Sequence, residues 1–77
     1  MSDTRFTPPF IVRAIITDSS GSGRYEVKTS NGKNYRAIIC DRRVHDAWAV
    51  KPNRSLPRGK SAWEFVVRQL REHNHVD

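Results

Sequence analysis

The segment from Arg24 to Cys40 constrains the fold more than any other part of the chain. Residues 24–29 alternate between charged side chains and apolar or hydroxyl side chains, and a similar apolar-rich run, 33–40, follows Ser-Asn-Gly. An alternation of period two predicts strands with one buried face, and Asn-Gly between them predicts a hairpin turn. We therefore expect an antiparallel sheet.

The pleat of the sheet decides between two registers for this hairpin. A two-residue Asn-Gly turn would pair Val27 with Arg36 and mix apolar and charged side chains on each face. A three-residue loop over Ser30–Gly32, with its glycine left-handed, pairs Val27 with Tyr35 and Glu26 with Arg36. Because a slip of one residue turns every side chain to the other face, we expect the second register. The residues expected on the core face are Tyr25, Val27, Tyr35, Ala37 and Ile39, and those on the outer face are Arg24, Glu26, Lys28, Arg36 and Ile38.

Two further elements flank this hairpin. Phe10–Thr17 is short and rich in β-branched residues, which favours another strand. After the hairpin, Asp41 can serve as the N-cap of a short helix, because Val44, Ala47 and Trp48 recur at helical spacing.

The last helix has the clearest start signal in the chain. The run Ser61-Ala-Trp-Glu64 matches a capping box, and Asn74 can end the helix 61–73 in a left-handed conformation. Its apolar stripe consists of Trp63, Val66, Val67 and Leu70. Together these elements predict an α+β fold: a three-stranded antiparallel β-meander packed on a C-terminal α-helix, with a short helix and a basic loop between them.

Seventy-seven residues make a single domain near the lower size limit for a stable core. We expect a flexible arm over residues 1–9, the domain over 10–74 and a tail over 75–77. Trp48, Trp63 and Phe65 are expected in the core, where burial stabilises the fold by about 1.5–3 kcal/mol for each large side chain.

Positive charge gathers in residues 51–60, which read Lys-Pro-Asn-Arg-Ser-Leu-Pro-Arg-Gly-Lys. The whole chain has 14 Lys and Arg against 8 Asp and Glu. A cationic loop on a basic domain is typical of a protein that binds a polyanion, most often nucleic acid. The candidate binding residues are Arg42, Arg43, Lys51, Arg54, Arg58 and Lys60 in and near the loop, and Arg24, Lys28 and Arg36 on the outer face of the sheet.

The preferred interpretation is a non-enzymatic nucleic-acid-binding protein, with DNA favoured over RNA. Tyr25 and Tyr35 are expected to point into the core, which leaves no aromatic platform there for unpaired RNA bases. Three alternatives stay open: an adaptor or inhibitor, with a phage as one source, that docks on an acidic protein or in a nucleic-acid channel; a small ribonuclease-type toxin; and a loop that only keeps the protein in solution.

Residues for metal or catalytic chemistry are few. The positions of Cys40, His45, His73 and His75 match no closed zinc motif, so we expect neither a metal nor a cofactor. The only candidate dyads are Cys40 with His45 and His45 with Asp46. Side chains so close in sequence on a short helix point to different sides, so we do not expect an enzyme.

The sequence also bears on location and assembly. No apolar run approaches the roughly 18 residues that cross a bilayer, and the first residues lack the apolar region of a secretory signal. The single cysteine fits a reducing compartment, so we expect a cytoplasmic protein without a membrane partner. An unpaired strand edge would allow a dimer.

Overall fold

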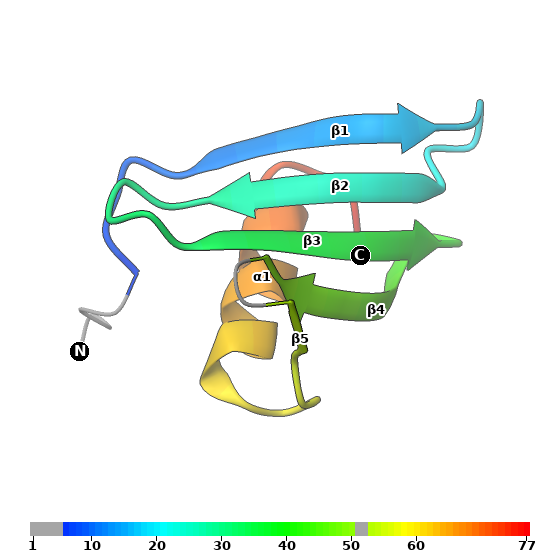
Figure 1. Cartoon of the computed structure of the whole chain (residues 1–77). Coiled ribbons are helices and arrows are strands. Elements are labelled where there is room, and N and C mark those ends of the chain that lie inside the picture. Colours follow the sequence, from blue (N-terminus) through cyan, green and yellow to red (C-terminus); the bar gives the residue numbers. More distant parts are fainter. Residues whose placement is uncertain (1–5, 51–52) are drawn as a thin grey trace.

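The computed structural model describes residues 6–50 and 53–77. Within these ranges the elements are β1 (Ile11–Thr17), β2 (Gly23–Lys28), β3 (Asn34–Cys40), β4 (Arg43–Ala49), β5 (Arg54–Ser55) and α1 (Ser61–Glu72). The strands form one antiparallel sheet in the order β1-β2-β3-β4-β5, and α1 lies against one face of it (Figure 1). The α+β class is confirmed. The three-stranded meander is wrong, because two more strands follow β3.

The hairpin of β2 and β3 has the register that the pleat predicts. Val27 pairs with Tyr35, Glu26 pairs with Arg36, and Gly32 in the turn has a φ of +88°. The residues predicted for the core face are all buried: Tyr25, Val27, Tyr35, Ala37 and Ile39.

A tight hairpin turn replaces the short helix that we expected after Asp41. Cys40 and Arg43 pair across the turn, and the two residues between them, Asp41 and Arg42, have φ angles of 53° and 62°. Two successive left-handed residues are typical of the two-residue turns that continue the twist of an antiparallel sheet. Asp41 therefore begins a hairpin turn rather than a helix.

A bulge explains why β4 resembles a helix in sequence. Consecutive residues of β3 pair with Asp46 and Val44, so His45 is an extra residue without a partner opposite it. As a result, Val44 and Ala47 both pack toward the core although they are three residues apart. This spacing is the one that a helix would show.

The basic segment also contains a short strand that we had expected to be loop. Arg54 and Ser55 form β5, which pairs with Ala49 and Trp48 of β4. Lys51, which we proposed as a binding residue, lies outside the described residues.

Helix α1 begins and ends with different caps from those predicted. Its N-cap is Lys60, whose side chain makes no capping hydrogen bond, so the capping box from Ser61 to Glu64 is wrong. At the other end, Asn74 is left-handed with a φ of 62°, as expected.

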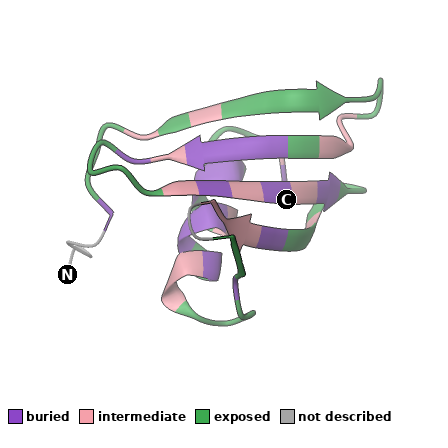
Figure 2. Ribbon diagram, viewed as in Figure 1, coloured by how far each residue is buried: buried purple, intermediate pink, exposed green. Residues whose placement is uncertain are grey.

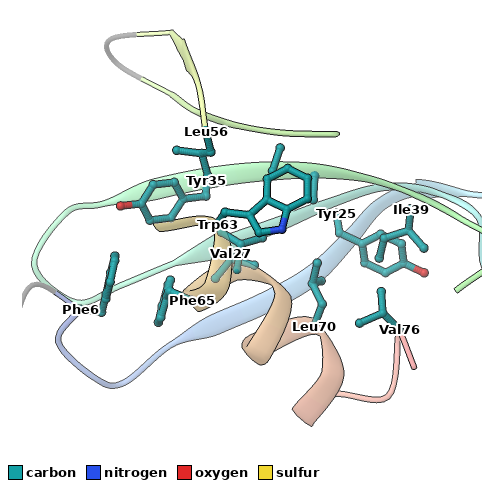
Figure 3. Close-up of a cluster of buried hydrophobic side chains, with 13 residues drawn as sticks. Phe6, Tyr25, Val27, Tyr35, Ile39, Leu56, Trp63, Phe65, Leu70 and Val76 are labelled. Atoms are coloured by element: carbon teal, nitrogen blue, oxygen red, sulfur yellow. The ribbon is translucent and has the colours of Figure 1, made fainter. Parts of the chain in front are cut away.

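The core lies between α1 and the inner face of the sheet (Figure 3). Trp63, Phe65, Val66 and Leu70 are buried on the helix, and the first two confirm the aromatic core that we predicted. Within the described ranges, no helix is long and apolar enough to cross a membrane.

Both ends of the described chain pack into this core. In the segment expected as an arm, Phe6 is 8% exposed and its ring stacks on Phe65 at 4.1 Å between centroids. In the expected tail, Val76 is buried, and the Asp77 backbone N–H donates to the carbonyl of Arg42. The packed core therefore includes residues outside 10–74.

Candidate functional site

The face of the sheet turned away from α1, which we call the outer face, gathers basic side chains. In Figure 1 the helix lies behind the strands, so the outer face is turned toward the reader. Because side chains alternate along a strand, the register fixes which residues share this face. Its basic residues are Arg13, Arg24, Lys28, Arg36 and Arg43, and its acidic residues are Glu26 and Asp46.

Glu26 holds two of these cations together. Arg13 Nε lies 2.6 Å and Lys28 Nζ 3.5 Å from its carboxylate oxygens, and the Glu26 side chain is only 3% exposed. Burial by itself raises the pKa of Glu26, but the hydrogen bond and charge of Arg13, together with Lys28, outweigh it and lower that pKa. Glu26 therefore stays ionised under the cations and neutralises part of their charge.

The remaining outer-face cations are not paired in this way. Arg24, Arg36 and Arg43 form no ion pair with another residue of the described ranges. Figure 2 shows how exposed and partly exposed residues are distributed along the strands. Arg24 and Arg43 are exposed and Arg36 is partly exposed. Their positive charge is therefore available to a ligand that approaches the outer face.

Two buried polar atoms on β3 also lack a hydrogen-bond partner among the described residues. They are Nε of Arg36 and Oδ1 of Asn34. Leaving such an atom unpaired costs about 1–3 kcal/mol, so most folded proteins avoid it. Both residues lie on the outer face by register, in the strand at the middle of the sheet.

Two of the predicted binding residues are held by other parts of the fold. Arg42 Nε lies 2.7 Å from Asp77 Oδ1, and its guanidinium also donates to Asn74. Arg58 Nη2 donates to the His45 carbonyl at 2.9 Å, and its guanidinium carbon lies 5.0 Å from the centroid of the Trp63 ring. These contacts position the C-terminal residues and the loop before α1.

The other two described loop cations are exposed but apart from the outer face. Arg54 lies on β5 at the edge of the sheet, and Lys60 lies at the start of α1, in the helix layer. The fold therefore brings Arg24, Lys28, Arg36 and Arg43 together on the outer face. It does not bring the loop cations into one group with them.

Trp48 is an outer-face residue that sequence reasoning placed in the core. It pairs with Arg36 on one side and Ser55 on the other, and it is half-buried. A pocket of about 360 Å³ lies beside it, lined by Asp46, Trp48, Asn53, Arg54 and Ser55. The signal that identifies Trp48 is the β4 register, which the bulge at His45 conceals.

The candidate catalytic residues do not assemble. A shallow groove of about 540 Å³ at the β3–β4 turn is lined by Cys40, Asp41, Arg43, Val44, His45, Arg58 and Asp77. In the described ranges no hydrogen bond joins Cys40 to His45 or the His45 side chain to Asp46. Nor do three metal-ligating side chains cluster anywhere in the described part of the chain.

Comparison of the chain with protein-family models, with curated proteins and with solved structures finds no match.

Proposed function

We propose that this protein binds nucleic acid through the outer face of its sheet, with DNA favoured over RNA. The observation that carries the proposal is the gathering of five basic residues, with two carboxylates, on the sheet face turned away from α1. A sheet face of this kind presents point charges and planar guanidinium groups to a row of phosphates.

The unpaired polar atoms of β3 also favour the outer face as the binding surface. Nε of Arg36 and Oδ1 of Asn34 lie beside the unpaired cations, where the chain alone leaves hydrogen bonding incomplete. A buried polar group without a partner calls for an explanation, and a bound ion is one of those that folded proteins offer.

The preference for DNA rests on groove dimensions. The major groove of B-form DNA is about 12 Å wide and admits a two-stranded ribbon such as β2 and β3. The major groove of A-form RNA is too deep and narrow for side chains to read. Alternate outer-face residues of the ribbon, Arg24, Lys28 and Arg36, would then face the groove.

The test is a binding titration on duplex DNA, single-stranded DNA and duplex RNA at several salt concentrations. If Arg24, Lys28, Arg36 and Arg43 each neutralise one phosphate, the log–log slope of affinity against salt on duplex DNA should be near −4. No binding at about 50 mM salt, or an affinity that salt does not change, would refute the proposal.

A matched pair of variants separates the outer face from net charge. Arg24→Gln and Arg68→Gln each remove one exposed positive charge, but Arg68 lies on α1 in the other layer. We expect Arg24→Gln to reduce the salt slope by about one and Arg68→Gln to leave it nearly unchanged. Equal effects of the two variants would contradict an outer-face site.

The edge strand favours a second candidate function, that of a small adaptor or inhibitor that docks on an acidic protein. Ile11, Ile15 and Ile16 of β1 are exposed beside the basic face, and apolar side chains are suited to a protein partner. Excess ultraviolet absorbance at 260 nm after purification would indicate bound nucleic acid. Specific capture of an acidic protein, without that absorbance, would indicate the adaptor.

A further inference from the structure

We infer that the pocket beside Trp48 binds one unpaired nucleobase of a DNA strand, with guanine preferred. The inference rests on the proposed function, since it specifies which form of DNA the outer face prefers. The outer-face cations neutralise phosphates of either form, whereas the pocket contributes only when a base is free to leave its stack.

The pocket has the size and the wall that a base requires. Its volume is about 360 Å³, and Trp48, which is half-buried, is the aromatic residue among the described residues that line it. Every base offers a π-face, and stacking on an aromatic side chain strengthens binding of a single strand. The strand pairings place Trp48 directly between Arg36 and Ser55, so a base stacked there lies next to a cation of the outer face.

The polar lining selects among bases. Asp46 Oδ1 accepts a hydrogen bond from the Ala47 N–H at 2.9 Å, which orients the carboxylate. Its Oδ2 has no hydrogen-bond partner among the described residues. A carboxylate only accepts hydrogen bonds, so it favours a base edge with adjacent donors.

Guanine offers two such donors side by side, N1–H and the N2 amino group. Adenine and cytosine offer one amino group each, next to an acceptor nitrogen. Thymine offers one N–H between two carbonyl oxygens, which a carboxylate repels. A good bidentate contact discriminates by about 1–3 kcal/mol in general, which corresponds to at least fivefold in affinity.

The other lining residues complete a nucleotide site. Asn53 and Ser55 add an amide and a hydroxyl, which can donate or accept. Arg54, at the rim on the edge strand, forms no ion pair with another described residue and can meet the phosphate of the bound nucleotide.

The experiment uses the full chain and short thymidine oligomers in which the central base is guanine, adenine, cytosine or thymine. Affinity is measured by quenching of tryptophan fluorescence at about 50 mM salt. We expect the guanine oligomer to bind about tenfold more tightly than the thymine oligomer. We also expect the guanine oligomer to bind more tightly than the same sequence paired in a duplex.

Two variants of the pocket test its parts. Asp46→Asn replaces two acceptors by a donor and an acceptor, so the preference should shift from guanine toward adenine. Trp48→Leu should weaken single-strand binding about fivefold or more and leave duplex binding nearly unchanged, whereas Trp48→Phe should retain most of the affinity. The matched control is Glu64→Gln on α1, which removes the same charge and should leave base preference unaltered.

The possible failures are distinguishable. Equal affinity for the four oligomers, together with a normal salt slope, overturns the base pocket and leaves the proposed function standing. A Trp48→Leu variant that weakens duplex and single-strand binding equally also overturns it. If no DNA of any form binds, both the pocket and the proposed function are refuted.

Discussion

The replacement Glu26→Gln should weaken the fold and strengthen DNA binding at the same time. The substitution keeps the shape of a side chain that is only 3% exposed, but it removes the charge that pairs with Arg13 and Lys28. A hydrogen bond to a charged group contributes about 1.5–3 kcal/mol to stability. Because Arg13 is 66% and Lys28 42% exposed, water compensates both cations in part. We therefore expect a loss of about 1–2 kcal/mol.

This loss should lower the melting temperature by about 5–15 °C for a domain of this size. Affinity should change in the opposite direction, since the outer face loses one of its two carboxylates. One charge about 8 Å from a phosphate in water is worth about 0.5 kcal/mol, so DNA should bind about two- to threefold more tightly. Urea unfolding and a DNA titration on the same sample measure the two effects.

The pH dependence of stability gives a third readout for the same variant. The pKa of Glu26 is lowered in the folded protein, so its contribution is complete above the unfolded-state pKa and is lost as pH falls through the folded-state pKa. Glu26→Gln should therefore lose part of the acid-induced destabilisation of the parent protein. The control Glu64→Gln removes an exposed carboxylate and should leave stability within about 0.5 kcal/mol. A Glu26→Gln variant as stable as the parent, or one that binds DNA more weakly, would show that Glu26 does not hold the cations as described.

Three further predictions concern the fold. Phe6→Ala should destabilise the protein by about 3 kcal/mol in urea unfolding, because Phe6 is buried and stacks on Phe65; no loss would show that Phe6 is not in the core. Gly23→Ala should prevent folding, or destabilise the protein far more than Gly32→Ala does. An added Cβ at Gly23 would lie 2.1 Å from the backbone oxygen of Ile16, whereas Gly32 has open space around it. Equal melting temperatures of the two variants would contradict this prediction. Burial, together with the positive charges of neighbouring residues, lowers the pKa of His75 in the folded protein. Stability should therefore fall as pH drops through the unfolded-state pKa of about 6.5, and then level off. His75→Gln should abolish this step, which unfolding curves at successive pH values would show.

The sequence predicts the parts of the fold in which local and long-range signals agree. The alternation of residues 24–29, the Gly32 turn and the apolar run of residues 33–40 all require one register, which is the one observed. The helix stripe of Trp63, Val66 and Leu70 likewise matches the buried side of α1. In these segments a different register or helix face would have exposed apolar side chains to water, so the apolar pattern determines the structure.

The β3–β4 turn and strand β4 were not predicted, because their backbone is irregular. The turn at Asp41 and Arg42 has no glycine, and the bulge at His45 shifts the apolar positions of β4 to helical spacing. Because of these two features, the prediction left β4 out of the sheet and placed Trp48 in the core. Four of the predicted binding residues do share one face, namely Arg24, Lys28, Arg36 and Arg43. Arg42 and Arg58 instead contact residues far away in the sequence, and the sequence alone does not show such contacts.

The order of the elements has a consequence for synthesis on the ribosome. Each strand pairs with the strand next to it in sequence, so every hairpin can form as soon as its second strand emerges. The buried helix residues, however, come from the last part of the chain, after Lys60. Until that part leaves the exit tunnel, Tyr25, Val27 and Ile39 have no helix to cover them. We therefore expect the nascent sheet to be a target for chaperones until the helix has emerged and can pack on it.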